Sequence, residues 1–492
     1  MSGARGPGRQ RAGANRADAK RPSANRAGAN RADANRADAK SPSANRSGGN
    51  RTAMARAGAG NRGAAARPPI DVRALEAVLP LDGPADVLLR AFFRRHPEMG
   101  RRDRAQVAET VFDVLRNRRL HAHLAQGGSG PLGARLVAVS RIRRGLPARV
   151  DGSAPDAPPD WLRRARDLDP AVLPFAVRFS LPDWLGDDLA KRPDGRALAA
   201  ALLEPAPLDL RVNALVTDRE SAIAALAEDG IVADALPLAP LALRVHGKPA
   251  LENSRAFRTG MVEVQDTGSQ LLAMLMAPRR GQTVIDLCAG AGGKTLALAA
   301  AMRSTGQVFA CDVSPSRLRR LRPRLQRAGA TNVQPMSIAS ERDPKLDRLA
   351  GRADAVLVDA PCSGTGTLRR NPDLKWRTSP EAISRLVEQQ RAILAAAARL
   401  VKPGGVLVYG TCSLLAEENE AQVRWFEATH SGFVREPARP VLQVQGAVLA
   451  EADAERAAAA GEREDGLLRL LPHRDGVDGF FAVRWRRTAP GN

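Results

Sequence analysis

Two cysteines have the residue type and the placement for covalent chemistry. Cys362 lies in the run DAPCS at 359–363, and Cys412 lies in the run TCS at 411–413. Each run follows an apolar segment typical of a buried strand, so a parallel sheet would bring both thiols to its carboxyl edge, where open α/β sheets bind ligands. A thiolate there is a strong nucleophile, and two thiols can divide attack and release between them. A lone Cys is more often a small buried apolar residue, but polar neighbours and a nearby glycine loop favour a functional pair.

Both cysteines fall within a repeated pattern of strand, glycine-containing loop and helix that begins at residue 259. The pattern predicts strands at 283–287, 307–311, 333–338, 353–358 and 406–410. One helix is predicted to begin at Ser379-Pro380-Glu381, which supplies an N-cap, a proline at the first helical position and an acid in the first turn, and to end before Lys402. Alternating strands and helices imply a parallel sheet with helices on both faces. We expect an antiparallel strand near 480–485 to complete this sheet.

The run DLCAGAGGKT at 286–295 follows a predicted strand and opens a helix. A Walker A loop needs Gly six residues before the Lys, where this chain has Cys288, and a GxGxxG fingerprint needs a third Gly where this chain has Thr295. The remaining candidate is a loop for S-adenosylmethionine. Asp312 supports it, because an acid about 20 residues on, after the second strand, is the usual ribose ligand. The alternative is a structural glycine turn with an unrelated acid at a strand end.

The chain before residue 259 divides into three parts. Residues 1–68 are of low complexity, with the segment 14–33 nearly repeated at 34–53, and almost no apolar residue there is larger than Ala. We interpret them as a disordered basic arm that adds non-specific RNA affinity, and a solvated tail without a task is an equal alternative. Residues 69–175 have a helical apolar period. Residues 176–258 contain the alternating run LDLRVN, which is typical of a strand in a small α+β module.

The helical part carries basic residues that have two interpretations. Arg116, Arg118 and Arg119 are expected on an exposed helix face, which either faces RNA or is an ordinary solvated face. The Gly-, Pro- and Asp-rich stretch at 144–159 is typical of a linker or a long loop.

The composition of the 492 residues limits the class of protein. The net charge of +22 favours a polyanion as partner, although an Arg-rich proteome would also give it. The four Cys have no CxxC spacing, which argues against a disulfide framework and a zinc site and indicates a reducing compartment. No apolar run approaches the roughly 20 residues that span a bilayer. His121 and His123 have no Cys nearby, so we expect no metal site.

Together these runs resemble the RsmB/Sun family of RNA cytosine-5 methyltransferases, and the resemblance covers 259–492 in the family's order. Further matching runs are VQD at 264–266, RNPDLKW at 370–376, EEN at 417–419 and DGFF at 478–481. The runs LRVN at 210–213 and RFSLPDWL at 178–185 resemble the module that precedes the family's catalytic domain. The helices of 69–150 loosely resemble the NusB-like domain of the bacterial ribosomal RNA members.

The resemblance implies a Rossmann-like domain that uses S-adenosylmethionine. It assigns attack on carbon 6 of cytosine to Cys412, assistance with release to Cys362, and stabilisation of the intermediate to Asp359 and Lys294. DNA cytosine-5 enzymes attack with the Pro-Cys cysteine instead, so the second cysteine marks the RNA family. The cofactor residues implied are Cys288, Ala289, Gly290, Ala291, Gly292, Gly293 and Lys294 around the methionine part, Asp312 at the ribose, and Arg317, Ser340 and Asp359.

Two positions depart from the family's pattern. Family members usually have Pro where this chain has Ala291, which predicts a slightly looser loop. The acid after the third strand, which contacts the adenine in the family, falls by spacing near Ser340 or Glu341.

We therefore expect a cytoplasmic, monomeric enzyme that methylates small-subunit ribosomal RNA, with no membrane or metal partner. Transfer RNA is the alternative substrate for the same chemistry. A non-catalytic RNA-binding assembly factor is the alternative from another class, but pure binding requires neither cysteine, nor Asp359, nor the glycine loop. Lys375 and Trp376 either contact RNA or pack the loop after Cys362, and His473 is expected at the surface or in packing.

Overall fold

The computed structural model describes residues 68–148, 158–449 and 466–489. The described residues all belong to one compact unit. The predicted basic arm therefore lies outside the described residues except for its last residue, and so does most of the predicted linker at 144–159.

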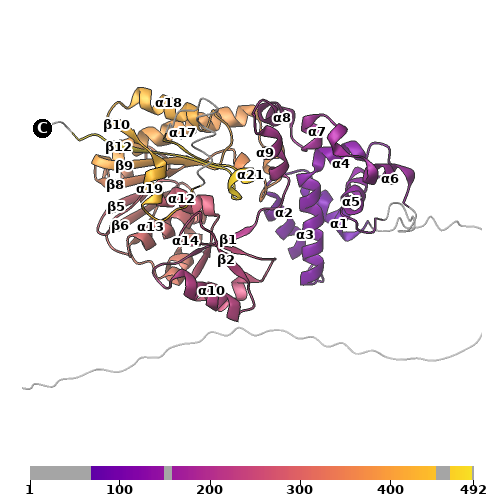
Figure 1. The fold of residues 1–492 in the computed structure, drawn as a ribbon, viewed down its shortest axis with the longest axis horizontal. Helices are drawn as coiled ribbons and strands as arrows, with labels where there is room; N and C mark the ends of the chain where they lie inside the picture. The colour runs from indigo at the N-terminus through magenta and orange to yellow at the C-terminus, as the bar shows by residue number, and fades with distance from the viewer. Residues whose placement is uncertain (1–67, 149–157, 450–465, 490–492) are drawn as a thin grey trace, which may run out of the picture. The chain divides into compact units, whose positions relative to one another are not determined.

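The large sheet has the predicted parallel core, which confirms the Rossmann-like fold (Figure 1). Its strands are β5 (Thr283–Asp286), β6 (Gln307–Asp312), β7 (Val333–Ser337), β8 (Ala353–Asp359), β9 (Val401–Thr411), β10 (Phe433–Glu436), β11 (Leu468–Leu470) and β12 (Phe480–Arg487). Their order is β10-β12-β9-β8-β5-β6-β7, and β11 pairs with β12. Strand β12 is antiparallel to β9, as expected from the sequence. Strand β9 begins five residues before the predicted start at 406, with a register shift against β8 between Ala353 and Ala355.

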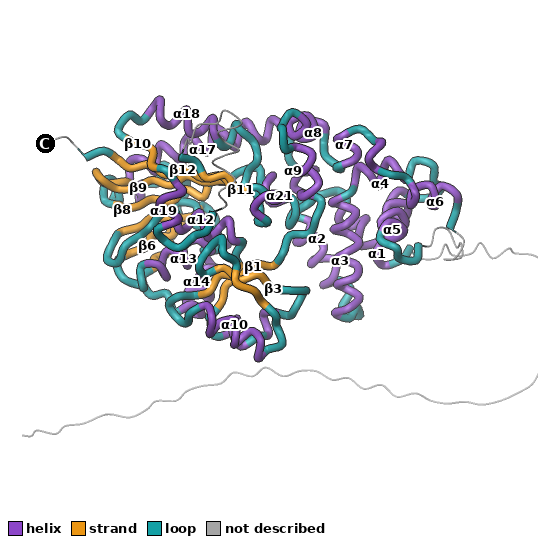
Figure 2. The backbone as a smooth tube through the Cα atoms, viewed as in Figure 1, coloured by secondary structure: helices purple, strands orange, loops and turns teal. Residues whose placement is uncertain are grey.

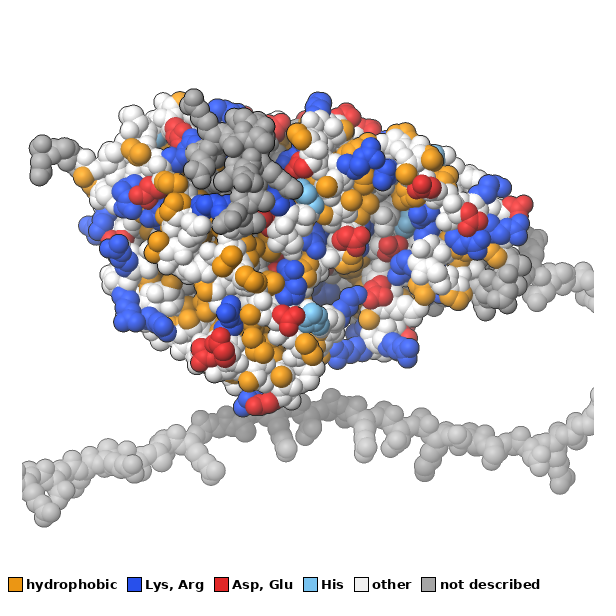
Figure 3. Space-filling model, viewed as in Figure 1, with side chains coloured by type: hydrophobic (Ala, Val, Ile, Leu, Met, Phe, Trp, Pro, Cys, Tyr) orange, Lys and Arg blue, Asp and Glu red, His pale blue; other side chains and the backbone are white. Residues whose placement is uncertain are grey.

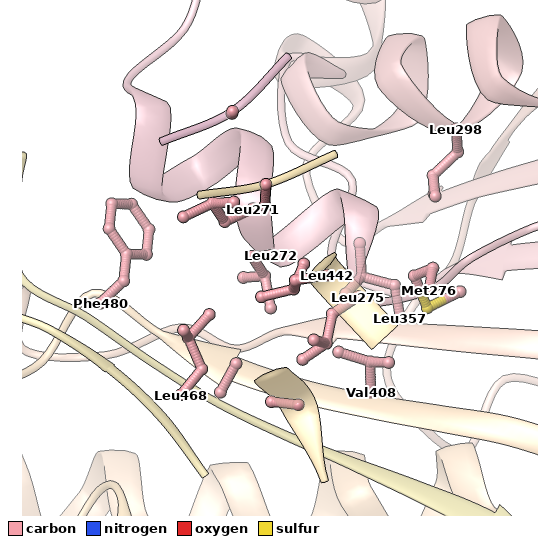
Figure 4. Packing of buried hydrophobic residues seen from close by; sticks show 14 of the residues in the cluster. Leu271, Leu272, Leu275, Met276, Leu298, Leu357, Val408, Leu442, Leu468 and Phe480 are labelled. Atoms are coloured by element: carbon pink, nitrogen blue, oxygen red, sulfur yellow. The ribbon is translucent and has the colours of Figure 1, made fainter. Parts of the chain in front are cut away.

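Helices cover both faces of this sheet because its strands are apolar on both sides (Figure 1). On one face lie α12 (Thr267–Met274), α13 (Gly293–Ala301), α14 (Pro315–Ala328) and α19 (Ala438–Gln443), and on the other α17 (Pro380–Leu400) and α18 (Glu420–Thr429). Leu357 of β8 packs with Leu272 of α12 on the first face (Figure 4). Its neighbour Val358 packs with Leu394 of α17 on the second face. This alternation fixes which way each strand end presents its side chains.

A smaller antiparallel sheet precedes the large one (Figure 2). Its strands are β1 (Leu208–Val212), β2 (Ala233–Ala235), β3 (Ala242–Val245) and β4 (Val262–Val264), in the order β2-β3-β1-β4. The helices α10 (Arg219–Glu228) and α11 (Arg255–Arg258) share an apolar core with it. Strand β4 lies beyond the boundary expected at residue 258, so this sheet takes its last strand from the segment that leads into the catalytic domain.

The described residues before β1 are helical. Helices were predicted for 69–175, but they continue to residue 202, into the range 176–258 that was expected to form the small α+β module. The helices are α1 (Ile70–Val78), α2 (Ala85–Arg94), α3 (Arg101–Arg116), α4 (Arg118–Leu124), α5 (Leu132–Arg143), α6 (Asp160–Asp167), α7 (Phe175–Arg178), α8 (Asp183–Ala190) and α9 (Gly195–Leu202). Shorter helices elsewhere are α15 (Pro344–Asp347), α16 (Leu374–Arg377) and α21 (Pro472–Asp475). No helix within the described ranges is long and apolar enough to cross a membrane.

The prediction of an exposed arginine face at 116–119 is wrong. Arg116 donates to the carbonyl of Arg369 at 3.0 Å, and Arg118 lies over the ring of Trp376. Arg119 donates to the carbonyl of Leu181 at 2.8 Å and pairs with Asp183. The apolar period shows which face of a helix enters its own core, but not what covers the opposite face.

Lys375 and Trp376 settle the choice that the sequence left open. The Lys375 ammonium donates to the carbonyl of Arg116 at 2.7 Å, and the Trp376 indole N–H donates to the carbonyl of Leu115 at 2.7 Å. Burial lowers the pKa of Lys375 to about 7. Both side chains therefore join α16 to the end of α3, with Lys375 buried and Trp376 partly buried.

Candidate active site

A cavity of about 430 Å³ opens where β5, β6, β8 and β9 end. Of the predicted site residues, Cys288, Ala289, Gly290, Ala291, Gly293, Lys294, Asp312, Arg317, Asp359, Cys362 and Cys412 line it. Gln389 and Ile393 of α17 add to its wall. The structure thus brings together both thiols and nearly the whole glycine loop at the expected edge of the sheet.

The two thiols are in contact. In the β8–β9 ladder Asp359 is opposite Gly410, so the loops that follow these strands run side by side. The Sγ atoms of Cys362 and Cys412 lie 3.4 Å apart, within hydrogen-bonding distance for sulfur. The hydrogen bond to Cys412 and burial raise the pKa of Cys362 well above its usual value. Cys362 is therefore held as a neutral thiol that can donate a hydrogen bond to the Cys412 sulfur.

The other two cysteines are poor candidates for nucleophilic chemistry. Burial raises the pKa of Cys288 well above its usual value, although this thiol lines the cavity. Burial also raises the pKa of Cys311 to about 12, and its side chain lies in the core between β6 and its neighbours. Thiolate formation is disfavoured at both positions.

A buried carboxylate joins the two cysteine loops. Glu418 is fully buried and accepts hydrogen bonds from the amide and hydroxyl of Ser363, which follows Cys362, and from the hydroxyl of Ser413, which follows Cys412. The amide of Gln390 on α17 donates to it at 3.0 Å and to the carbonyl of Pro361 at 2.9 Å. Four donors therefore fill this carboxylate, which links the residues that follow the two cysteines.

Glu418 is a functional residue that the sequence analysis did not assign. The run EEN at 417–419 matched the resembling family, but nothing in it distinguished an exposed Glu417 from a buried Glu418. The available signal was the position of this run, directly after a cysteine loop that contains serine donors.

Lys294 and Asp359 form an ion pair on the cavity wall, with Nζ and Oδ2 2.7 Å apart. Burial lowers the pKa of Lys294, but the charge and the hydrogen bond of Asp359 raise it by more, so the pKa lies above its usual value. The ammonium also lies over the ring of Phe480, 5.6 Å from its centroid. A charged group is thus held rigidly beside the thiols, where it can stabilise charge that develops on a bound ring.

The glycine loop meets the acid predicted for the ribose. Asp312, at the end of β6, accepts from the amide of Gly290 at 2.8 Å and from that of Ser314 at 2.7 Å. Its oxygens retain lone pairs for hydroxyl donors at the cavity. A Cβ built at Gly290 would meet nothing closer than a carbonyl at 4.0 Å, so there is open space above the loop. These features fit the ribose and methionine parts of S-adenosylmethionine.

Two predicted cofactor residues do not line the cavity. Gly292 has φ +84°, and a Cβ there would lie 2.1 Å from a methyl group of Leu321 on α14. Its part is to let the loop pack against α14. Ser340 instead accepts from the amide of Arg342 at 3.1 Å, and its neighbour Glu341 lines the cavity wall. Of the two positions that spacing allowed for the acid after β7, the structure favours Glu341.

Asp286, at the end of β5, lies beneath the loop. Its Oδ2 accepts from the hydroxyl of Thr295 at 2.7 Å, and its Oδ1 has no partner among the described residues. Burial raises the pKa of Asp286 to about 7, with the hydrogen bond from Thr295 lowering it and the charge of Asp359 raising it further.

The three histidines considered from the sequence lie apart from the cavity. His121 is buried, and burial lowers its pKa to about 4. His473 is partly buried, 3.3 Å from Asp194. Within the described ranges, no group of three or more His, Cys, Asp or Glu side chains is placed to hold a metal ion.

Comparison with known families matches both sheets. A sequence model described as 16S rRNA methyltransferase RsmB/F matches residues 273–486. A second, described as the ferredoxin-like domain of RsmF/B-like methyltransferases, matches residues 181–252.

Individual proteins match over most of the chain. The probable ribosomal RNA small subunit methyltransferase B of Synechocystis sp. is 32% identical over 447 residues, which cover 83% of this chain and 96% of that protein. Ribosomal RNA small subunit methyltransferase B of Sodalis glossinidius is 35% identical, over 78% of this chain and 90% of that protein.

Solved structures agree with the sequence matches. The crystal structure of PH0851 has a TM-score of 0.68 at 28% identity and covers 86% of this chain and 99% of its own. A methyltransferase homologue from Pyrococcus horikoshii has a TM-score of 0.54 at 28% identity, with 65% and 100% covered. With its cavity, its thiol pair and these matches, the chain belongs to the RsmB/F family of S-adenosylmethionine-dependent methyltransferases.

Proposed function

We propose that this protein methylates carbon 5 of cytosine in RNA, and that small-subunit ribosomal RNA is its substrate. The observation that carries the proposal is the contact between Cys362 and Cys412, at 3.4 Å, on the wall of the cofactor cavity. Methyl transfer to nitrogen or oxygen does not need a thiol nucleophile, whereas carbon 5 of cytosine is too weak a nucleophile without one.

The two thiols have different tasks in this proposal. Cys412 attacks carbon 6 of the ring, and the new carbon–sulfur bond makes carbon 5 electron-rich. When bound, S-adenosylmethionine supplies the electrophilic methyl group. A base then removes the proton from carbon 5, the carbon–sulfur bond breaks, and the aromatic ring returns. The raised pKa of Cys362 supports this division, because a thiol that keeps its proton is a poor nucleophile and can donate a hydrogen bond to the attacking sulfur.

Lys294 and Asp359 would stabilise the ring while it is bonded to Cys412. Attack at carbon 6 places extra electron density on the ring, and the pair supplies a fixed cation and a carboxylate at the cavity wall. Because the ion pair holds both groups in place, little reorganisation accompanies the reaction.

RNA as the substrate rests on the named relatives and on charge. Both relatives quoted above are named for ribosomal RNA of the small subunit. The net charge of +22 suits a polyanion. On the face shown in Figure 3, Lys and Arg side chains are spread among acidic ones over both the sheets and the helical part. We place this monomeric enzyme in the cytoplasm, where ribosomal RNA is available.

Trapping of the covalent adduct tests the proposal. A Cys362→Ala variant is mixed with S-adenosylmethionine and unmodified small-subunit ribosomal RNA and analysed on a denaturing gel. We expect a protein–RNA band, because release is impaired while attack is not. The band should vanish when Cys412→Ala is added, and should be absent with Cys311→Ala alone, a matched control whose thiol is buried outside the cavity.

The other outcomes separate the alternatives. A band with transfer RNA and not with ribosomal RNA would keep the chemistry and change the substrate. A band from Cys412→Ala instead of Cys362→Ala would reverse the two roles. If no variant forms a band although both ligands bind, the protein is an RNA-binding factor on a methyltransferase fold, and the proposal fails.

A further inference from the structure

The small sheet directly contacts the loop that forms the cofactor cavity. In the pairing of β1 with β4, Arg211 is opposite Glu263, and both are almost fully buried. Neither side chain lines the cavity. Arg211 is hydrogen-bonded directly to a carbonyl of the glycine loop, and Glu263 is connected to another through one intervening arginine. The sequence analysis noted Arg211 only as part of a matching run and did not consider Glu263.

Arg211 holds the end of the loop. Its Nη1 donates to the carbonyl of Gly293 at 2.8 Å and to the side-chain oxygen of Gln265. The side chain is 4% exposed, and burial lowers its pKa to about 10. Within the described part of the chain its hydrogen-bond partners are amide oxygens and not carboxylates. Burial of a guanidinium is costly, and the nearby charge of Glu263 offsets part of that cost. The bond to the carbonyl of Gly293 is the direct contact of this side chain with the loop.

Glu263 holds the middle of the loop through Arg324. Its carboxylate pairs with Arg324 at 3.0 Å and with Arg327, both on α14. The free nitrogen of Arg324 donates to the carbonyl of Ala291 at 2.7 Å. The chain β4–Glu263–Arg324–Ala291 therefore fixes a second carbonyl of the same loop from the same sheet.

These contacts matter because the loop has no side chains long enough to anchor it. Its residues between Cys288 and Lys294 are Gly and Ala, and Gly290 and Gly292 have positive φ, so it has no side chains of its own to anchor it. A trans peptide points its C=O and N–H in opposite directions. Arg211, by binding the carbonyl of Gly293, thus directs the amide of Lys294, in the first turn of α13, away from the small sheet.

We propose that Arg211, and Glu263 acting through Arg324, are positioning residues that set the affinity of the cavity for S-adenosylmethionine. The small sheet is then a part of the cofactor site as well as a separate module. This inference rests on the cofactor assignment and not on the identity of the methylated base or RNA.

Calorimetric titration of the full chain with S-adenosylmethionine tests it. Arg211→Met removes the guanidinium and keeps most of the volume, and its Kd should rise roughly tenfold or more, the size of one lost charge-assisted hydrogen bond. Arg211→Lys retains a hydrogen-bond donor, so its Kd should lie between that of Arg211→Met and that of the parent. The matched control is Arg244→Met, on β3 of the same sheet, which loses a pairing with Asp209 and a hydrogen bond to the carbonyl of Gly476 but contacts no loop residue.

A purely structural role would give another pattern. If Arg211→Met and Arg244→Met weaken binding equally, or if Arg211→Met binds as the parent does, the inference is overturned. Should Arg211→Met fail to fold, Arg324→Met answers the same question, since this side chain is partly exposed. In turnover assays KM for the cofactor should rise while kcat at saturation is kept. If the parent protein binds the cofactor but methylates no cytosine, the proposed function fails while this inference on cofactor affinity can still hold.

Discussion

The two sides of the cavity are held in opposite ways. The cofactor loop has carbonyls that accept from Arg211 and Arg324, cations that come from outside the strand–loop–helix unit. The thiol loops have amide and hydroxyl donors that converge on one anion, Glu418. A loop of small residues needs external donors, whereas loops rich in serine can share one internal acceptor.

This difference separates binding from chemistry. Substitution of Arg211 or Arg324 should change the affinity for the cofactor. Substitution of Glu418 should change the geometry of the thiols. The two sides meet at Lys294, which lies in the first turn of α13 and pairs with Asp359, three residues before Cys362.

The largest expected effect comes from Glu418→Ala. Four donors would lose their acceptor, so the free energy of unfolding should fall by about 3 kcal/mol or more. A shift of the cysteines of about 1 Å would lower kcat roughly 100-fold, while the Kd for S-adenosylmethionine should stay within a few-fold of the parent. Single-turnover methylation and calorimetry measure the two quantities.

The exposed neighbour provides the control for that variant. Glu417→Ala should leave turnover and stability nearly unchanged, because this side chain accepts none of the four bonds. Equal losses of cofactor affinity and turnover in Glu418→Ala would show that the two sides are not separable.

Gly292→Ala should act on the opposite side. The new methyl group would meet Leu321 at 2.1 Å, in a backbone conformation that Ala rarely adopts, so the loop must move. We expect the Kd for the cofactor to rise about tenfold. Gly329→Ala has a similar φ of +67° with nothing within 4 Å, so it should cost about 1 kcal/mol of stability and leave Kd unchanged. Equal Kd values for the two variants would contradict the packing argument.

A smaller effect concerns pH. Because Asp286 has a pKa of about 7 in the folded protein against an ordinary value of 3.8, the folded state keeps a proton that the unfolded state loses. Its contribution to stability is complete below pH about 4 and is lost as pH rises to about 7. Asp286→Asn cannot ionise, so relative to the parent it should gain about 2 to 3 kcal/mol between pH 5 and pH 8.5. Urea unfolding at both pH values measures the free energy of unfolding of the two proteins. A difference between them that is the same at pH 5 and pH 8.5 would refute the prediction.

The catalytic sheet could be predicted because its signals are local. Apolar runs, glycine loops and the capping residues at Ser379 each act over a few residues, and they indicated the parallel core and the meeting of Cys362 with Cys412. The antiparallel partner of β9 was likewise predicted from its own segment.

What could not be predicted depends on contacts between distant segments. Glu418 is defined by donors from three other segments, and Arg211 by a carbonyl 82 residues away. Arg116 and Arg119 were expected to be exposed because a helix period does not reveal a neighbouring domain. Spacing left Ser340 and Glu341 as alternatives after β7, and only the fold shows that Glu341 lines the cavity.

The end of α3 has a consequence for how this chain can be divided. Its last carbonyls accept from Lys375 and Trp376, which lie in the segment between Cys362 and Cys412. A catalytic fragment without the helical part would therefore expose a buried ammonium and an indole whose acceptors are gone. Any fragment or chimera of this chain should therefore keep the end of α3 together with residues 374–377.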